Sequence, residues 1–351
     1  MTQTDVDDHK DSGTETSRKG RVMLDSENQR IYDIMSRVRS AYFKTRNDDE
    51  LLVRLRRIER GIQDELKPGH ALTVVGESGT GKSTVVQKAL KSLTTLRDYD
   101  DGYDNLMRPI LYVTAPASCT MNDLAAEILE RLGYENSVIG RGAPVYHKVQ
   151  RSLKNYDTKL VVIDEFQHVL QAPKIKGAAY VTDSLKNMLQ DSSWPVHLVF
   201  VGLPEIDTLI ERDPAEQLGR RTDPFYIENP IFEEDADYFD WIVSELVEKR
   251  AGLRLSADQP NEFIERLMHG ARSRFGLIMD LITWAIEDAL ETGSDEVATT
   301  NWIEAYARLA KCKRDQDNVF AEPAWRGIIR PVNRDGTLGP VVPAKPKKKG
   351  R

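Results

Sequence analysis

Eight consecutive residues in the first quarter of the chain have the types and spacing needed to hold a triphosphate. Residues 76–83, Gly-Glu-Ser-Gly-Thr-Gly-Lys-Ser, fit the pattern G-x-x-x-x-G-K-[ST], the Walker A motif. The glycines allow the backbone to curl so that successive N–H groups point at phosphate oxygens. Lys82 can then reach the β and γ phosphates, and the Ser83 hydroxyl can ligate Mg²⁺. The motif and the residue after it predict a site for ATP and Mg²⁺ formed by Gly76, Glu77, Ser78, Gly79, Thr80, Gly81, Lys82, Ser83 and Thr84.

The segments on either side of this loop are those that a phosphate site requires. The apolar run 71–75, Ala-Leu-Thr-Val-Val, predicts a buried strand, and residues 84–90 predict a helix. The N-terminal end of a helix carries a partial positive charge, which favours a bound anion. A chance match to the bare pattern is the alternative, and the flanking strand and helix argue against it.

A second apolar run ends in two carboxylates. Residues 159–165, Lys-Leu-Val-Val-Ile-Asp-Glu, predict a Walker B strand that places its last two side chains beside the phosphate loop. Asp164 would hold Mg²⁺, directly or through water, and Glu165 would orient and deprotonate the attacking water. Alone, the same run would suit a buried strand followed by a solvated acidic turn. The Walker A motif upstream favours the catalytic interpretation.

The composition indicates a packed protein without the overall positive charge of a dedicated nucleic-acid binder. The chain has 351 residues, 40% of them hydrophobic, and a formal net charge of −7. Any contact with DNA must therefore come from a local patch. The two cysteines form neither a disulfide framework nor a metal cluster, which suits a reducing compartment. No apolar run approaches the length of a membrane span and the start lacks signal-peptide character, so we expect a cytoplasmic protein with no membrane partner.

The sequence pattern divides the chain into five parts. They are a polar start (1–24), two helices (25–68), an α/β core (69–232), a helical lid (233–313) and a tail (314–351). The first segment is poor in apolar residues and is expected to be disordered. The second has apolar residues at helical spacing, with a break predicted near Asn47-Asp48-Asp49. The tail is rich in Pro and Gly, and it either wraps its own domain or docks onto a neighbour. Its basic end, 345–351, is either a phosphate-binding arm or a solvated tail.

Alternating strand and helix patterns predict an α/β fold. Strands are expected at 109–115, 197–203 and 225–227, in addition to the two that carry the motifs. Helices between them, including 121–132 and 145–156, would complete a five-stranded parallel sheet with helices on both faces. Beyond residue 234 the strand pattern stops. A small C-terminal helical lid is predicted from helices at 235–249, 260–269, 275–290 and 299–311.

The two motifs, the extension Asp164-Glu165-Phe166-Gln167-His168 and the segment Val201-Gly202-Leu203-Pro204-Glu205 together resemble the TnsC/TniB family over about residues 25–315. Members of this family are AAA+ ATPases that regulate DNA transposition in Tn7-like and related elements, including CRISPR-associated ones. The resemblance implies an AAA+ P-loop core whose ATP-bound subunits assemble as a ring or helical filament around double-stranded DNA. It also implies, as partners, transposase subunits and a target-selector protein of the TniQ or TnsD type. Hydrolysis would reset the assembly.

The resemblance further implies an arginine finger, which follows the fourth strand and reaches the γ-phosphate of the adjacent subunit. Arg221 lies at that position, with Arg220 as the second candidate. If either acts in this way, the active site is split between subunits and a monomer should hydrolyse ATP poorly. The alternative is that both arginines pair with surface carboxylates such as Glu216 or Asp223.

Two sensor positions can also be located by the resemblance. A sensor-2 arginine should begin the third lid helix, where Arg274 lies, with Arg272 as the alternative. The sensor-1 position departs from the usual pattern, because the strand ends Phe200-Val201-Gly202-Leu203-Pro204 and offers no polar side chain. We therefore expect slow, oligomer-dependent hydrolysis, which suits a switch better than a motor.

Two residues that follow the acidic pair, and four residues further from the motifs, are additional candidates. His168 invites a catalytic or metal role, although packing of the helix after Walker B is the favoured interpretation, and Gln167 is a candidate relay from the γ-phosphate to DNA-facing loops. Contacts to backbone phosphates are assigned to Thr120, Asn122, Lys148 and Arg151. A solvated helix face explains the two basic residues equally well.

Two other function classes fit parts of the sequence. An ATPase accessory to secretion or cell-envelope assembly has a similar core, but such proteins usually carry a membrane span or a periplasmic module. A P-loop kinase for a small molecule needs no arginine from another subunit, so the lid and the pair Arg220-Arg221 argue against it. The preferred interpretation is an ATP-dependent, DNA-binding oligomeric regulator of transposition.

Overall fold

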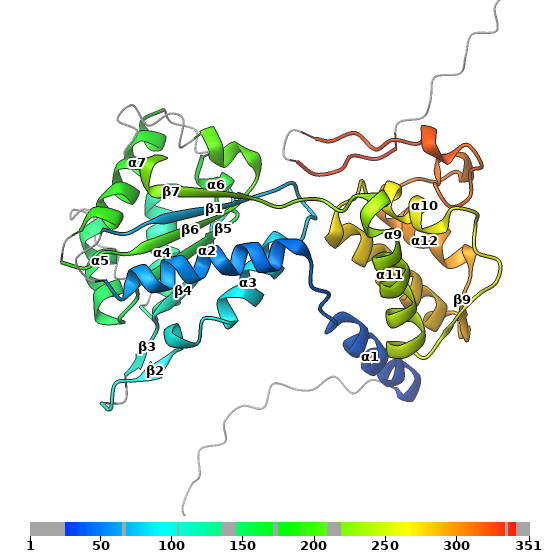
Figure 1. Cartoon of the computed structure of the whole chain (residues 1–351), viewed down its shortest axis with the longest axis horizontal. Helices are drawn as coiled ribbons and strands as arrows, with labels where there is room; N and C mark the ends of the chain where they lie inside the picture. The colour runs from blue at the N-terminus through cyan, green and yellow to red at the C-terminus, as the bar shows by residue number, and fades with distance from the viewer. Residues whose placement is uncertain are drawn as a thin grey trace, which may run out of the picture.

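The chain is described by a computed structural model, which covers residues 25–64, 68–103, 105–134, 145–170, 175–191, 193–208, 219–333 and 336–341. Two lobes are joined by segments that cross between them (Figure 1). The first lobe holds the parallel sheet, and the second is helical. The start that was expected to be disordered, 1–24, and the basic run 345–351 lie outside the described residues.

Five parallel strands form the centre of the first lobe, in the order β4-β5-β6-β1-β7. Ala71, at the start of β1, is paired with Leu198 on one side and Thr222 on the other. Three of the strands are buried along their whole length, as expected of a sheet that is covered on both faces. The predicted sheet is confirmed, with β1 (Ala71–Val75), β4 (Ile110–Thr114), β5 (Leu160–Asp164), β6 (His197–Gly202) and β7 (Thr222–Tyr226).

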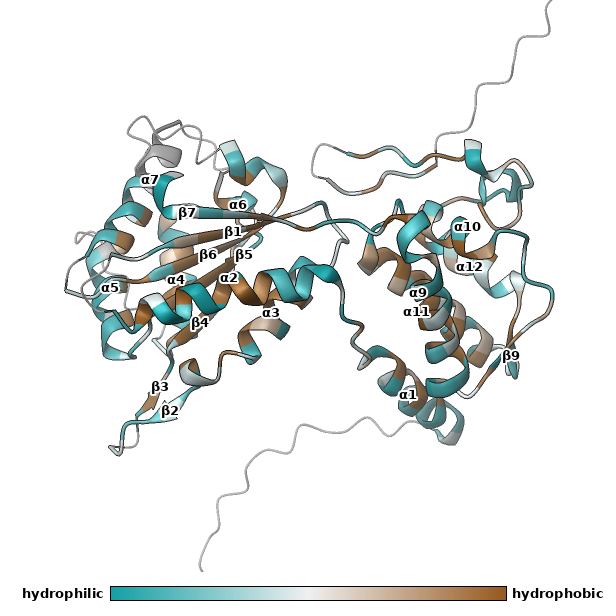
Figure 2. Ribbon diagram, viewed as in Figure 1, coloured by the Kyte–Doolittle hydropathy of each residue, from teal (hydrophilic) through white to brown (hydrophobic). Residues whose placement is uncertain are grey.

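Helices cover both faces of this sheet because successive side chains of each strand point in opposite directions. Leu72 and Val74 pack with α2 and α3, whereas Ala71 and Val75 pack with α4, α5 and α7. Figure 2 shows the apolar strands enclosed by helices with hydrophilic outer surfaces. The helices are α2 (Arg46–Ile62), α3 (Lys82–Lys91), α4 (Met121–Arg131), α5 (Val145–Asn155), α6 (Gln167–Leu170) and α7 (Ile175–Gln190).

The second lobe contains the four helices that the sequence predicted for the lid. Phe239, Trp302 and Tyr306 are buried in their shared core. The short strands β8 (Arg254–Leu255) and β9 (Glu296–Val297) pair beside them. The helices are α9 (Phe232–Ser244), which continues as a π-helical segment (Glu245–Arg250), α10 (Phe263–Gly270), α11 (Phe275–Glu291) and α12 (Thr299–Ala310).

The first two helices of the chain belong to different lobes. α1 (Ser26–Arg39) buries Ile34, Met35 and Val38 in the core of the helical lobe, whereas α2 packs against α3. The expected N-terminal unit 25–68 is therefore divided, because the apolar face of each helix fits a different core.

The break between these helices differs from the predicted one. It covers residues 40–45, and the run Asn47-Asp48-Asp49 lies in the first turn of α2. The Thr45 N–H donates to the Asp48 carboxylate (2.8 Å), as in a capping box. These polar residues begin the helix and do not interrupt it.

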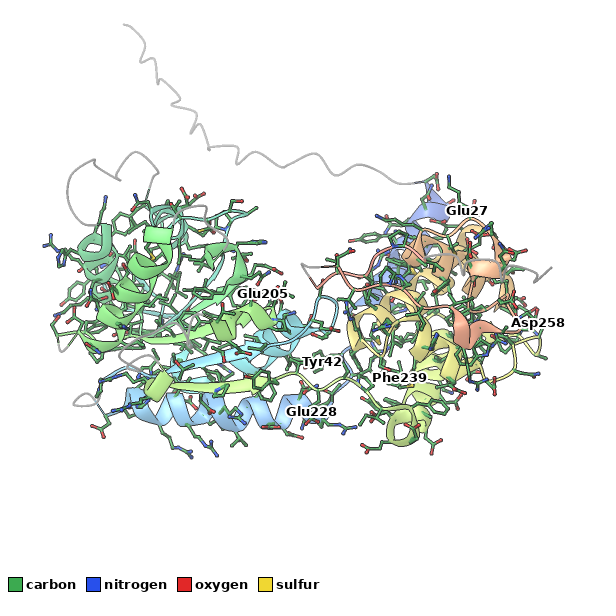
Figure 3. The ribbon with its side chains drawn as sticks, turned by 90° about the horizontal axis from the view of Figure 1, so that it is seen from above. Glu27, Tyr42, Glu205, Glu228, Phe239 and Asp258 are labelled. Atoms are coloured by element: carbon green, nitrogen blue, oxygen red, sulfur yellow. The ribbon has the colours of Figure 1, made fainter. Side chains whose placement is uncertain are left out.

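Two segments cross between the lobes, and a side-chain amide links them. Tyr42 lies on the first crossing and Glu228 on the second (Figure 3). Asn47 Nδ2 donates to the carbonyl of Glu228 (3.0 Å), and the N–H of Glu228 donates to Asn47 Oδ1 (2.9 Å). These two hydrogen bonds therefore hold the two crossings together.

The part of the tail that the structure describes packs on the helical lobe. Phe320 and Trp325 are buried in its core. Val332 and Leu338 then form an antiparallel bridge. The described part of the tail therefore packs on the chain's own domain, which is one of the two alternatives that the sequence left open.

A hairpin that the sequence did not predict, β2 (Tyr99–Asp100) with β3 (Leu106–Met107), projects from the first lobe before β4 (Figure 1). Its strands have two residues each, too short for a periodic signal. Short 3₁₀ turns complete the described elements: Thr94–Leu96, Pro204–Ile206, Gly219–Arg221, Asp315–Asp317 and Trp325–Gly327.

Candidate nucleotide-binding site

The loop between β1 and α3 has the conformation that a phosphate cradle requires. Gly79 and Gly81 have φ angles of 81° and 91°, a left-handed region that glycine adopts without strain. Gly81 is also the N-cap residue of α3. The Thr80 hydroxyl donates to the carbonyl of Glu77 (2.9 Å), which closes the loop on itself. The loop therefore presents its N–H groups and the helix N-terminus to the same region.

Lys82 is buried at the base of this loop. Its Nζ donates to the carbonyl of Glu77 (2.8 Å). Burial lowers the pKa of Lys82, and the nearby charges of Glu165 and Asp164 oppose that shift. The ammonium group lies between the loop and the two Walker B carboxylates, where it can exchange its carbonyl partner for a phosphate oxygen.

Ser83 and Asp164 are brought together by a tyrosine that the sequence analysis missed. Tyr112 Oη donates to Asp164 Oδ2 (2.5 Å), and Ser83 lies against the same phenol. Burial and the bond to Asp164 raise the pKa of Tyr112. A hydroxyl and a buried carboxylate at one place are hard oxygen ligands, so these residues fit Mg²⁺. No sequence signal indicates Tyr112, because it reaches Asp164 through the pairing of β4 with β5.

Glu165 follows Asp164 in a left-handed conformation, with φ of 54°. Its carboxylate accepts a hydrogen bond from Gln167 Nε2. His168, which follows Gln167, donates to no carboxylate among the described residues. Its Nδ1 lies 3.1 Å from the carbonyl of Ala115. This contact supports the packing interpretation of His168.

Arg274, the predicted sensor-2 residue, lies on the phosphate loop. Its side chain is 1% exposed, and Nη2 lies 2.6 Å from Glu77 Oε2. Nη1 donates to the carbonyls of Ser78 (3.0 Å) and Gly336 (2.8 Å). Arg272, the alternative, precedes it with φ of 55° and is exposed. Of the two arginines, only Arg274 contacts the loop.

The lid meets the loop through two glycines. The N–H of Leu277 donates to the carbonyl of Gly79 (3.2 Å). A Cβ atom on Gly276 would lie 2.7 Å from that same oxygen, closer than real contacts allow. Glycine at 276 therefore permits the N-terminus of α11 to sit directly on the phosphate loop.

A cavity of about 380 Å³ opens beside this contact, a size suited to a nucleoside. It is bounded by the loop, by the first crossing segment and by α11. Its lining includes Tyr42, Phe43, Thr80, Gly81, Thr84, Phe275, Gly276, Met279, Asp280 and Thr283. Sequence analysis missed the residues outside the motif, because they come from two distant segments without a shared pattern.

The two finger candidates lie away from this site. Arg221 ends the turn before β7, whose first residue pairs with Ala71 at the start of β1, whereas the phosphate loop follows the end of β1. Because β1 has five residues, Arg221 at one end of it and the phosphate loop at the other lie about 17 Å apart. Neither Arg221 nor Arg220 can therefore reach the phosphates held by its own chain.

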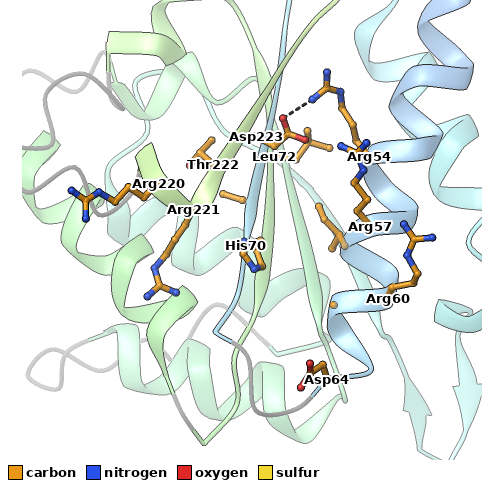
Figure 4. A pocket seen from close by; sticks show the side chains of 13 residues that line it. Arg54, Arg57, Arg60, Asp64, His70, Leu72, Arg220, Arg221, Thr222 and Asp223 are labelled. Atoms are coloured by element: carbon orange, nitrogen blue, oxygen red, sulfur yellow. Dashed lines mark hydrogen bonds and ion pairs between the residues drawn. The ribbon is translucent and has the colours of Figure 1, made fainter.

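Arg220 and Arg221 instead line a cavity of about 520 Å³ together with three arginines of α2, namely Arg54, Arg57 and Arg60 (Figure 4). Of the carboxylates named as alternative partners, Asp223 pairs with Arg54, and Glu216 lies outside the described residues. Arg221 makes no ion pair with any described residue. The cavity has a strongly positive lining.

The four residues assigned to DNA contacts lie on two helices that pack together, α4 and α5. Thr120 is the N-cap of α4, and its hydroxyl donates to Asp123 Oδ2 (2.7 Å). Asn122 and Arg151 are exposed, and Lys148 is half-buried. The structure brings the four onto neighbouring helices and gives Thr120 a capping role.

Comparisons with known proteins give one matching family and several similar solved structures. The family described as "Bacterial TniB protein" matches residues 36–229, and no curated protein sequence matches. The solved Orc1 protein of Aeropyrum pernix in complex with DNA is 18% identical, with a TM-score of 0.56, over 81% of this chain and 70% of that one. Cdc6p from Pyrobaculum aerophilum is 14% identical, with a TM-score of 0.55, over 80% and 72%. These likenesses support the predicted AAA+ fold. Within the described residues, no helix is long and apolar enough to span a membrane.

Proposed function

The chain belongs to the TniB family, and on this basis we propose that it is an ATP-dependent, DNA-binding oligomer that regulates DNA transposition. The observation that carries the proposal is the assembly of Lys82, Asp164, Glu165 and Arg274 around one phosphate loop, while Arg221 lies at the opposite end of β1. We assign the first four to the ATPase site of one chain, and Arg221 to the site of another copy of the chain.

The chemistry of this site is hydrolysis of the γ-phosphate of ATP. The oxygen of a water molecule forms a bond to the γ-phosphorus, the bond from that phosphorus to the β–γ bridging oxygen breaks, and ADP leaves with the electron pair. Glu165 accepts the proton of the attacking water. Lys82 and Arg274 bind the phosphate oxygens on which charge develops, and Mg²⁺ held by Ser83 and Asp164 would neutralise part of it.

The charge of the site favours a contribution from a second subunit. Within one chain, two cations, Lys82 and Arg274, face three carboxylates, those of Glu77, Asp164 and Glu165. A triphosphate adds several negative charges, of which Mg²⁺ neutralises only part. More positive charge is needed to stabilise the transition state.

The arginine-lined cavity provides such charge on a different face of the molecule. It holds five arginines and two carboxylates, those of Asp64 and Asp223. A donor and an acceptor surface on different faces of one subunit produce head-to-tail contacts, which close as a ring or continue as a helical filament. We therefore infer that Arg221, or Arg220 beside it, contacts the triphosphate of the adjacent subunit. Hydrolysis that depends on this contact is slow in the monomer.

Double-stranded DNA, transposase subunits and a target-selector protein of the TniQ or TnsD type are the partners proposed from family membership. The Orc1 structure was determined in complex with DNA, and its likeness to this chain is compatible with such binding. Contacts from α4 and α5 to the phosphate backbone would position the assembly on duplex of any sequence.

Assembly is the property that tests this function. The protein is mixed with a slowly hydrolysed ATP analogue and duplex DNA, and particle size is measured by electron microscopy and by light scattering. Large rings or filaments are expected only when both ligands are present. Particles that remain monomeric at all protein concentrations would overturn the proposal.

A further inference from the structure

A buried side-chain amide links the water-activating carboxylate to the end of β6. Gln167, at the start of α6, is 4% exposed. Its Nε2 donates to Glu165 Oε2, and its Oε1 accepts a hydrogen bond from the N–H of Leu203 (3.3 Å). The two partners determine which end of the amide faces which group, because a carboxylate only accepts and an N–H only donates.

The end of β6 has room for this amide because it has no side chain of its own. A Cβ atom built on Gly202 would lie 2.2 Å from Gln167 Oε1. The following residue, Leu203, is apolar. β6, which lies between β5 and β1, therefore carries no polar side chain at its end. The side chain of Gln167, two residues after the Walker B strand segment 159–165, occupies that space.

We propose that Gln167 is a positioning residue for Glu165, and that it supplies from the Walker B segment the polar group that the end of β6 lacks. It contacts the carboxylate and not the substrate, so it acts through Glu165. The inference rests on the proposed ATP hydrolysis.

The local backbone explains why Glu165 needs such a partner. Its φ of 54° is a conformation that residues with a side chain seldom adopt. The Glu165 side chain leaves this turn with several rotatable bonds, whereas a general base must hold one orientation toward the water. The hydrogen bond from Gln167 restricts the carboxylate. Because Gln167 is also bonded to Leu203, the position of the carboxylate is fixed relative to the end of β6.

Replacement of the amide by a side chain of similar length tests this role. Gln167→Met keeps the packing and removes both hydrogen bonds. We expect kcat to fall about tenfold or more, because misplacement of a catalytic group is costly, while affinity for a fluorescent ATP analogue stays within about twofold. Gln150→Met is the matched control, since Gln150 is also buried and bonded, to the carbonyl of Trp194, but lies away from the site.

A pair of double variants separates positioning from packing. Gln167→Ala removes the atom that would lie nearest to a Cβ on Gly202, which leaves Ile206 Cδ1 at 3.0 Å as the next neighbour. Gly202→Ser can then place a hydroxyl there, and Gly202→Ala, whose Cβ meets the same neighbours, cannot. The Gln167→Ala/Gly202→Ser protein is expected to recover several-fold in kcat over Gln167→Ala. Equal recovery in the Gly202→Ala version would show that only packing matters and would overturn the inference.

Wild-type activity separates this inference from the function on which it rests. If the wild-type protein does not hydrolyse ATP under assembly conditions, the proposed function fails. If it does, and Gln167→Met retains the wild-type kcat as Gln150→Met does, then the positioning role alone is wrong.

Discussion

Arg274 of the helical lobe forms an ion pair with Glu77 of the phosphate loop, with Nη2 2.6 Å from Oε2. The guanidinium is buried, and its remaining hydrogen bonds go to backbone carbonyls of the loop and of the C-terminal segment. One side chain therefore connects the lid, the loop and the tail. We expect the oxygens of a bound triphosphate to replace the Glu77 carboxylate as the partner of Arg274.

Removal of this guanidinium should weaken nucleotide binding and loosen the lid. For Arg274→Gln we expect affinity for ATP to fall about tenfold, since a hydrogen bond to a charged group is worth about 1.5–3 kcal/mol. Equilibrium binding of a fluorescent analogue measures the change. Arg272→Gln removes the same charge two residues away and should leave affinity unchanged. Equal losses in both variants would contradict the assigned role.

The two Walker residues should have opposite effects on assembly. Lys82→Ala removes the cation that binds the β and γ phosphates, so nucleotide binding and DNA-dependent assembly should both be lost. Glu165→Gln removes only the base, so the protein should bind ATP and remain assembled. Light scattering over time measures the lifetime of the particles. If the two variants fail in the same way, the separation between binding and hydrolysis is wrong.

An arginine that acts on the neighbouring subunit can be recognised by mixing two inactive proteins. Arg221→Ala keeps its own phosphate loop and Glu165, and Glu165→Gln, which is expected to stay assembled, keeps its arginines. In a mixed assembly, sites with an intact Glu165 meet intact arginines, so hydrolysis should reappear well above the sum of the separate proteins. Arg56→Ala, on α2 but outside the arginine-lined cavity, serves as the active control. Absence of any recovery would place Arg221 outside the active site.

Stability should decrease in mild acid because of His197. This residue is buried against His70, and burial, together with the charges of His70 and Lys159, lowers the pKa of His197 from 6.5 to about 4. A lowered pKa in the folded state means that the unfolded chain binds the proton first as pH falls. The contribution is therefore complete above pH 6.5 and is lost between 6.5 and about 4.

The expected loss over this interval is about 3 kcal/mol in the free energy of unfolding. Urea titrations at several pH values measure it. His197→Phe removes the titrating group, at the cost of the bond from the N–H of His70, and should flatten the dependence. A variant with the same pH profile as the wild type would assign the effect to other groups.

Affinity for duplex DNA should fall steeply with salt and vary little with sequence, because phosphate contacts release counterions. Replacement of both Lys148 and Arg151 by Ala should reduce the slope of log affinity against log salt by about two. Fluorescence anisotropy with two unrelated duplexes measures both properties. A strong preference for one duplex, or an unchanged slope, would remove these residues from the DNA surface.

Sequence alone was sufficient for the parts of this protein that depend on neighbouring residues. The Walker A loop, the Walker B strand and the four lid helices could be predicted because glycine spacing and apolar periodicity act within one turn or one strand. The five-stranded parallel sheet followed from the alternation of these elements. The predicted break near Asn47 was wrong, because polar residues that cap a helix resemble those that end one.

Tertiary structure decided which distant residues share a site. Glu77 and Arg274 are 197 positions apart, and no local pattern relates them. The division of α1 and α2 between two lobes, the tyrosine beside Asp164 and the amide beside Gly202 depend in the same way on packing. Local chemistry determines what each segment can do. The order of strands in the sheet and the closure of the lid determine which of these segments act together, because they arise only when the apolar faces of the whole chain are buried at once.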